Sequence, residues 1–450
     1  MNAQPQPGYF DGLNERLLAA VPPNARNVIE FGCANGLLGA AFKNRCPSTR
    51  WTGVDVSGAA VAEARGRLDS VVQMDLDAPE PSLLGGGYDV VVFGDVLEHL
   101  RDPESFLQLA RRISAADARL VCCLPNMAHV SVIERMLAGD ISYDSMGLLD
   151  RTHLRFLSPA SSFKMLLDAG WLPNLRDGHA IRHSVQPFVA HLLAAAQEIG
   201  IPQDTCARNI FLYQLIVDCV KSPQAGNDES TSPFTVVVPV NRSSQFELNV
   251  ARSPGLLEIG AEIIAVQGAQ DAAHALTTGA GGATKRWILY CHQDVYIPKG
   301  SGQLLSRLLE SIPEEEARYA LIGFAGLGID RGGRVSKSGL VVDRTSLFDH
   351  PEAAQAVSLD EFAIVIGRDS VHQIDPSLGW HAWGTDLCLA ARHRHRAAQV
   401  RIARVPMFHN SFNDARLPPE FDASIRALLG KYPKLDVVET LNGTFTRQAQ

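Results

Sequence analysis

The stretch "NVIEFGCANG", residues 27–36, decides the fold of the first half of this chain. A short β-rich run leads directly into Gly32, and Gly36 precedes a segment with helical character. Glycine permits a positive φ and a close approach of the backbone to a ligand, and the N-terminus of a following helix offers free N–H groups. The stretch therefore predicts a strand, a tight ligand-binding turn and a helix.

The same alternation of strand and helix continues beyond this turn. Further β-rich runs are "RWTGVDVS", "YDVVVFGD" and "ARLVCCLP", separated by the helical stretches "AAVAEARGRL" and "PESFLQLARRI". Such near-continuous apolar strands between helices are typical of a parallel sheet covered on both faces, with "FLYQLIVDCVK" as its final strand. After a Ser-, Pro- and Gly-rich linker, the second half also contains short β-rich runs, which are "FTVVVPV", "AEIIAVQG", "RWILYCHQD", "YALIGFAG" and "EFAIVIG". We therefore expect two α/β domains, 1–220 and 233–450, joined by a linker at 221–232.

Composition narrows the functional classes. The chain has 450 residues, of which 46% are hydrophobic and 20% charged, as in ordinary multidomain globular proteins. Its formal net charge of -8, without clusters of Lys and Arg, argues against nucleic-acid binding. The eight cysteines include no C-x-x-C pair, and most lie in apolar runs, which indicates free thiols in a reducing compartment. With no signal peptide and no apolar stretch long enough to span a membrane, we expect a cytoplasmic protein. The oligomeric state is left open.

An acidic residue accompanies the glycine turn. Asp55 ends the second predicted strand, 23 residues after Gly32, a spacing at which a carboxylate meets ribose hydroxyls in dinucleotide-type folds. Taken alone, this pattern is also what a purely structural turn followed by a solvent-exposed Asp55 would give. A nicotinamide dinucleotide site typically has the motif G-x-G-x-x-G, which this turn lacks, so the sequence argues against an oxidoreductase.

Four motifs that follow one another along the chain indicate the class of this site. "IEFGCANG", "GVDVS", "MDLD" and "FGDVLEHL" together resemble the class I S-adenosylmethionine-dependent methyltransferases over roughly residues 10–220. The resemblance implies a Rossmann-like fold with Gly32 and Gly36 in the cofactor turn. It departs from the family at Ala34, where glycine is usual.

The resemblance also implies roles for three acids and three candidate bases. Glu30 is expected near the methionine ammonium, Asp55 at the ribose hydroxyls and Asp75 on the adenine side; each is alternatively a surface or helix-capping acid. A hydroxyl acceptor, from a small molecule or a saccharide, also needs a base. The candidates are Asp95, His99 and His153, the last in a loop that resembles the acceptor side of small-molecule and sugar methyltransferases.

A second polar cluster follows a strand in the C-terminal half. In "RWILYCHQDVYIP", residues 286–298, the apolar run delivers Asp294 at its C-terminal end, where ligands of α/β sheets bind. A carboxylate there can hold Mg²⁺ or Mn²⁺ against substrate phosphates, although a turn-capping role is the simpler alternative.

The wider pattern of that half resembles the family 2-like glycosyltransferases of GT-A fold, over roughly residues 233–412. "HQDV" stands where D-x-D is usual, so one carboxylate is missing. The resemblance implies a nucleotide-sugar donor, a metal ion held by Asp294 and His409, and Asp386 as the acceptor base; an ordinary acid stabilised by a helix N-terminus is the alternative for Asp386. Trp380, His381 and Trp383 are candidate sugar-stacking residues, with core packing as the commoner alternative for aromatic side chains.

These readings lead to two hypotheses. The first is a bifunctional enzyme that uses S-adenosylmethionine and a nucleotide-sugar in saccharide or polysaccharide biosynthesis. The second is a methyltransferase whose C-terminal domain is a non-catalytic glycan-binding module.

Overall fold

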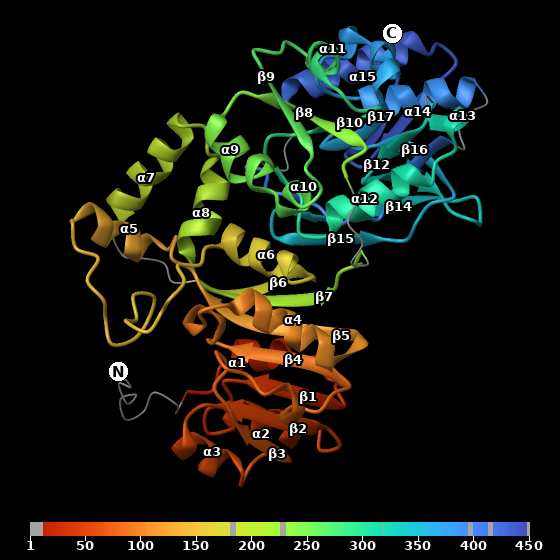
Figure 1. Ribbon diagram of the computed structural model, residues 1–450. Helices are drawn as coiled ribbons and strands as arrows, with labels where there is room; N and C mark the ends of the chain where they lie inside the picture. Colours follow the sequence, from red (N-terminus) through yellow and green to blue (C-terminus); the bar gives the residue numbers. More distant parts are fainter. Residues whose placement is uncertain are drawn as a thin grey trace. The chain divides into compact units, whose positions relative to one another are not determined.

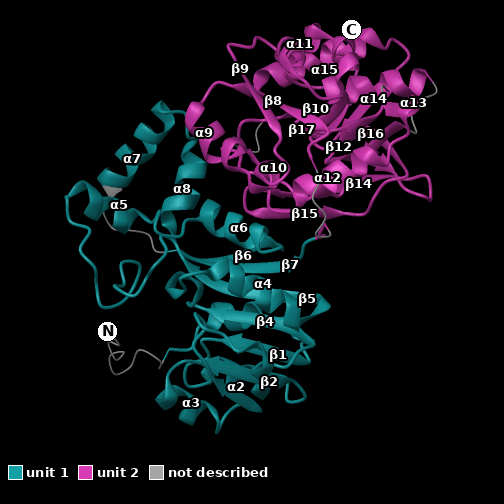
Figure 2. Ribbon diagram, in the orientation of Figure 1, with its two compact units in different colours: residues 1–222 teal, residues 223–450 magenta. Residues whose placement is uncertain are grey.

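The chain divides into two compact units, Met1–Ser222 and Pro223–Gln450 (Figure 2). A computed structural model describes most of both units, and part of the predicted linker lies outside the described residues. The described residues are 12–180, 186–225, 231–317, 319–394, 399–412 and 417–447.

The first unit is built on a seven-stranded sheet in the order β3-β2-β1-β4-β5-β7-β6 (Figure 1). Its strands are β1 (Asn27–Phe31), β2 (Arg50–Asp55), β3 (Ser70–Gln73), β4 (Tyr88–Gly94), β5 (Ser114–Pro125), β6 (Trp171–Ala180) and β7 (Leu212–Lys221). The five strands from β3 to β5 are parallel, but β7 runs antiparallel to both β5 and β6. The expectation of a wholly parallel sheet was therefore wrong: β7 fills the place between β5 and β6, so the sheet is mixed.

Helices cover this sheet, and its interior strand β1 is buried on both faces. Val28, Ile29 and Phe31 of β1 are fully buried, as a strand covered on both sides requires. The helices are α1 (Glu15–Ala20), α2 (Leu37–Arg45), α3 (Gly58–Ala64), α4 (Pro103–Ile113), α5 (Val130–Leu137), α6 (Pro159–Asp168), α7 (Gln186–Glu198) and α8 (Gln203–Phe211), with 3-10 turns η1 (Pro81–Leu83) and η2 (Leu97–His99). The carboxyl ends of β1, β2 and β4 consequently meet at one edge.

The second unit contains two six-stranded sheets and a hairpin. The first sheet has the order β18-β12-β17-β10-β8-β9, and β17 runs antiparallel to β10 and β12. Its strands are β8 (Phe234–Val240), β9 (Glu262–Gln267), β10 (Trp287–Cys291), β12 (Leu321–Gly323), β17 (Ala363–Gly367) and β18 (Val400–Ile402). The second sheet has the order β11-β19-β14-β13-β16, with β15 on β14. Its strands are β11 (Val295–Tyr296), β13 (Ala325–Ile329), β14 (Val335–Asp343), β15 (Ser346–His350), β16 (Gln355–Leu359) and β19 (Phe408–His409), and the hairpin is β20 (Val437–Thr440) and β21 (Gly443–Thr446).

Alternate residues of the first of these sheets enter opposite cores. Ile288 and Tyr290 of β10 belong to one hydrophobic cluster, whereas Leu289 and Cys291 belong to the other, which is the two-residue period of a strand. The helices are α9 (Ser243–Leu248), α10 (Pro254–Leu257), α11 (Ala272–Gly282), α12 (Ser301–Glu310), α13 (Glu314–Ala317), α14 (Trp383–His393) and α15 (Pro419–Lys431), with η3 (Val250–Arg252), η4 (Arg368–Gln373) and η5 (Pro376–Leu378). This unit is therefore also α/β, with mixed sheets.

Among the described residues of either unit, every helix is too short or too polar to cross a bilayer.

Candidate functional site

The glycine turn after β1 has the backbone geometry that its sequence predicts. Gly32 and Gly36 have φ of 71° and 80°, in the left-handed region. A Cβ on Gly32 would lie 2.1 Å from Cγ2 of Val96, so even alanine would have to displace this side chain. Ala34, between the two glycines, has φ of 47°, a conformation that costs an alanine about 1 kcal/mol or more. The turn is therefore strained at Ala34 and needs support from outside.

Asp55 supplies that support. Its Oδ2 accepts a hydrogen bond from the Ala34 N–H at 2.9 Å, and its Oδ1 accepts one from the Ser57 N–H at 2.8 Å. The side chain is only 7% exposed, at the end of β2. Each carboxylate oxygen has a second lone pair, so Asp55 can brace the turn and still accept bonds from a ligand.

Glu30 lies buried in β1, and its carboxylate accepts a hydrogen bond from the Trp51 indole N–H at 2.8 Å. Burial, reinforced by the charge of Asp55 and opposed by the Trp51 bond, raises the pKa of Glu30 to about 8. A cationic ligand would reverse this effect by favouring the carboxylate. Asp75 differs, because it is exposed and its Oδ1 accepts a bond from the N–H of Asp77 at 2.9 Å.

The strand β4 brings the second group of polar side chains. Asp95 follows it with φ of 52°, and its Oδ1 accepts a hydrogen bond from Nε2 of Gln214 in β7 at 2.8 Å. Burial raises the pKa of Asp95, although His99 and His153 act to lower it. No role was predicted for Gln214, which lies 119 residues from its partner Asp95, or for Glu98, although Glu98 belongs to the motif "FGDVLEHL".

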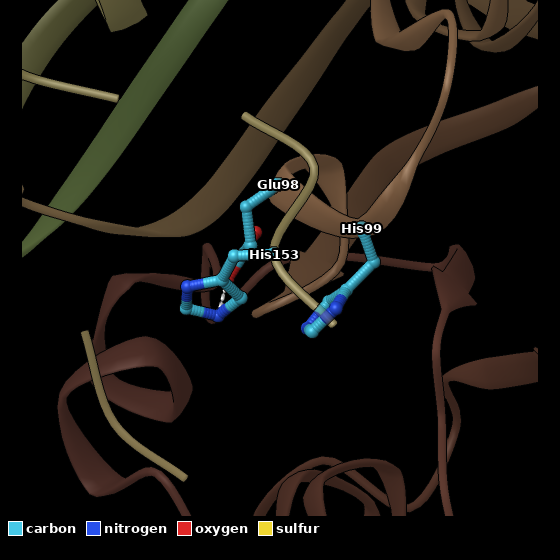
Figure 3. A group of neighbouring side chains, drawn as sticks. All are labelled: Glu98, His99 and His153. Carbon is cyan, nitrogen blue, oxygen red and sulfur yellow. Dashed lines mark ion pairs between the residues drawn. The ribbon is translucent and has the colours of Figure 1, made fainter. Parts of the chain in front are cut away.

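Glu98, His99 and His153 lie close together (Figure 3). Glu98 is 1% exposed, and Oε1 of its side chain lies 4.0 Å from Nε2 of His153. Burial, with the charges of Asp95 and Asp150, raises the pKa of Glu98 well above its ordinary value. Burial lowers the pKa of His99, whose ring centroid lies 4.9 Å from that of His153.

One cavity of about 760 Å³ joins these two groups. The predicted residues that line it are Glu30, Gly32, Asp55, Asp75, Asp95, His99 and His153. Gly36 is not among them, since it packs against Ala64 and Leu68 and begins α2. The volume is within the range of roughly 300–1,000 Å³ typical of small-molecule sites. Oδ1 of Asn35, also in the wall, is buried without a hydrogen-bond partner among the described residues, as expected of a group that awaits a ligand.

The second unit brings His292, Asp294 and His409 together at the end of β10. Nε2 of His409 lies 3.5 Å from Oδ1 of Asp294, and its Nδ1 lies 3.0 Å from Oδ1 of Asp343. Burial opposes a charged imidazole, but the two carboxylates outweigh it and raise the pKa of His409 to about 10. Burial likewise acts to raise the pKa of Asp294, yet His409 lowers it to about 2. Burial lowers the pKa of His292 to about 4, so this ring is neutral.

Asp386 lies elsewhere in the second unit. It is 1% exposed in the first turn of α14, and its carboxylate accepts bonds from Lys431 Nζ at 2.7 Å and from the Tyr432 hydroxyl at 2.8 Å. Its predicted role as a base stays a prediction. Trp383 is fully buried beside Tyr290, with ring centroids 5.2 Å apart, so the expectation that it stacks on a sugar was wrong.

The chain is similar in part to known proteins. A family model described as a methyltransferase domain matches residues 2–172. A Mycobacterium tuberculosis protein named "Probable S-adenosylmethionine-dependent methyltransferase" is 28% identical over 193 residues, which cover 41% of this chain and 65% of that protein. The malonyl-[acyl-carrier protein] O-methyltransferase of Alcanivorax borkumensis is 31% identical over 115 residues, covering 25% of this chain and 39% of the relative. The chain thus spans less than two thirds of the length of either relative.

One solved structure is also similar in part. An S-adenosylmethionine-dependent methyltransferase from Archaeoglobus fulgidus is 18% identical, with a TM-score of 0.34, and covers 48% of this chain and 97% of its own.

Proposed function

Because the N-terminal region contains a class I S-adenosylmethionine-dependent methyltransferase domain, we propose that this protein methylates a small-molecule or saccharide acceptor. The observation that carries the proposal is the cavity of about 760 Å³ that joins the glycine turn to a cluster of acids and histidines. When bound, the cofactor supplies an electrophilic methyl group on a sulfonium centre.

The residues of the turn fit such a cofactor. Gly32 allows the left-handed turn and the close approach of Val96, and Asp55 keeps lone pairs for ribose hydroxyls while it holds Ala34 in place. Glu30 provides the buried carboxylate that a methionine ammonium needs, and Asp75 is the exposed acid on the adenine side.

The opposite end of the cavity would receive the acceptor. There the chain must hold the acceptor oxygen in line with the methyl group, and positioning of this kind contributes roughly 7–11 kcal/mol in favourable cases. Asp95 and His153 are the two groups proposed to take up the hydroxyl proton, with His99 beside them.

Calorimetric titration of the full chain with S-adenosylhomocysteine tests this proposal. We expect one binding event per chain, and no binding of NADH at the same concentrations. Failure of S-adenosylhomocysteine to bind a folded chain would overturn the methyltransferase assignment.

For the second unit, we propose glycosyl transfer from a nucleotide-sugar, which would make the protein bifunctional in saccharide biosynthesis. The observation that favours it is the position of Asp294 at the carboxyl end of β10, with His292 and His409 close by. A divalent ion such as Mn²⁺ or Mg²⁺, held by Asp294 and by His409 after loss of its proton, would neutralise the diphosphate leaving group. Asp386 is the proposed acceptor base, although Lys431 and Tyr432 already engage both its oxygens.

The alternative for this unit is a non-catalytic glycan-binding module. It is favoured by the missing carboxylate of D-x-D and by the bonds that occupy Asp386. Release of UDP or GDP from nucleotide-sugars by the full chain, with and without Mn²⁺, separates the two. Metal-dependent release that disappears in Asp294→Asn supports glycosyl transfer, whereas no release leaves the binding module. For either activity we propose a cytoplasmic location, on the basis of the eight free thiols.

A further inference from the structure

We propose that Glu98, His99 and His153 bind a divalent transition-metal ion at the acceptor end of the cavity, and that this ion holds an oxygen of the acceptor. Its catalytic use rests on the proposed methyltransferase function, but the binding of the ion does not.

The three side chains come from two segments that the main chain ties together. Glu98 and His99 lie in η2, directly after β4, and His153 lies in the loop before α6. The N–H of Leu154 donates to the carbonyl of Glu98 at 2.9 Å, which fixes the loop against η2. One potential ligand atom from each side chain lies within 4.8 Å of the others. All three side chains line the cavity, so an ion bound there would be open to a substrate.

Both imidazoles are oriented as metal ligands usually are. Nδ1 of His99 lies 3.2 Å from the carbonyl oxygen of Thr152, and Nδ1 of His153 lies 3.0 Å from that of Leu148. Because a carbonyl oxygen can only accept, each Nδ1 carries a proton, and Nε2 is the nitrogen of each ring that can bind a metal ion. A backbone carbonyl on the second ring nitrogen is the common outer partner of a metal-bound histidine, since it fixes both tautomer and ring orientation.

Glu98 is the group that the protein alone leaves unsatisfied. Its side chain is 1% exposed, and its Oε2 has no hydrogen-bond partner among the described residues. Its Oε1 lies 4.0 Å from Nε2 of His153, which is too far for a hydrogen bond, and a small closing movement of the two side chains would bring both atoms onto one ion (Figure 3). A buried carboxylate without a partner is unfavourable, and a divalent cation between these atoms would satisfy it.

The donor set indicates the class of ion and substrate. Two imidazoles and one carboxylate suit Zn²⁺ and other transition metals better than Mg²⁺, which prefers oxygen ligands. Three protein ligands leave positions open, so the acceptor would be one that offers a hydroxyl or carboxylate oxygen. With Nε2 of His153 on the metal, Asp95 becomes the group in this wall that takes up the hydroxyl proton.

Direct measurement of bound metal tests the site without requiring turnover. The full chain carrying Asp294→Asn, which disrupts the second cluster found among the described residues, would be titrated with Zn²⁺, Mn²⁺ and Mg²⁺ by calorimetry, and bound metal would be counted by elemental analysis. We expect one equivalent of Zn²⁺, and affinity lower by more than about 100-fold in Glu98→Gln and His153→Asn, because even loss of an outer partner costs about 10- to 100-fold. His191→Asn, at an exposed histidine of α7, is the matched control and should change nothing.

Titration with S-adenosylhomocysteine shows whether each variant is folded and separates the two proposals. Metal binding that is absent, or equal in the parent and both ligand variants, overturns the metal site even when S-adenosylhomocysteine binds normally. Metal binding lost only in the ligand variants supports the site, even if S-adenosylhomocysteine fails to bind and the methyltransferase proposal falls.

Discussion

The described residues contain two clusters of two histidines and one acid, and the clusters differ in the groups that face their imidazoles. In the first unit, both histidines face backbone carbonyls through Nδ1, so Nε2 is the ring nitrogen left to bind a ligand. In the second unit, His409 lies between Asp294 and Asp343, so it is an imidazolium that completes an internal ion pair. The same residue types therefore form an open site in one place and a neutralised network in the other. Whether a carboxylate or a backbone carbonyl faces the imidazole decides which of the two arrangements forms.

The largest expected effect is on stability and concerns the cluster of His292, Asp294 and His409 in the second unit. Replacing His409 by asparagine leaves Asp294 and Asp343 without their cation, and breaking a buried ion pair costs roughly 3–5 kcal/mol. The pKa of His409 is raised to about 10, so its stabilisation is complete below its unfolded value near pH 6.5 and is lost as the pH rises through 10. We expect the difference in thermal unfolding midpoint between wild type and His409→Asn to be large at pH 6 and small above pH 10.

His292→Asn is the control within the same cluster, because it removes a ring that is already neutral. Its stability relative to the wild type should not vary between pH 7 and 10. An equal pH dependence in both variants would contradict the assignment of the charge to His409.

The next effect concerns the turn of the first unit. In Asp55→Ala the strained Ala34 loses its hydrogen-bond acceptor and a bound ribose loses its carboxylate. Because hydrogen bonds to a charged group contribute about 1.5–3 kcal/mol, affinity for S-adenosylhomocysteine should fall about 10- to 100-fold by calorimetry. Asp75→Ala, at the exposed acid of the same cavity, should weaken binding less. Equal losses would mean that Asp55 has no special place in the site.

A smaller effect is a proton released on binding. The pKa of Glu30 is about 8 in the free protein, so its carboxyl is mostly protonated at pH 7, and a bound ammonium favours the carboxylate. Binding of S-adenosylhomocysteine at pH 7 should therefore release close to one proton, and affinity should rise with pH up to about 8. Calorimetry in buffers of different ionisation enthalpy measures this release. Glu30→Gln should abolish it, and an unchanged release in that variant would exclude Glu30 as its source.

The last prediction is that one substitution, Asp294→Asn, has no effect on cofactor binding. Asp294 belongs to the second unit, and all residues that line the cavity belong to the first, so Asp294→Asn should leave the affinity for S-adenosylhomocysteine unchanged. The same titration checks it, and a clear loss of affinity would show that the two units are coupled.

Local patterns were enough to predict some parts of the molecule. The strand before Gly32, the turn and the strand that ends at Asp55 follow from periodicity and glycine placement, because those signals act over a few residues. The partners of the site residues could not be predicted in this way. Gln214 reaches Asp95, and Asp343 reaches His409, only through the strand order of their sheets. β7 was predicted as a strand, but its antiparallel direction was not, because a buried strand has the same sequence pattern in either direction.

The bond between Trp51 and Glu30 has a spectroscopic consequence. The indole is fully buried, and its N–H donates at 2.8 Å to a carboxyl whose charge should change when a cation arrives. A charge appearing beside an excited indole shifts its emission, so this tryptophan is a built-in fluorophore at the cofactor end of the cavity. Occupancy of the cavity can then be followed optically in the unlabelled chain, with Trp51→Phe giving the signal of the other four tryptophans.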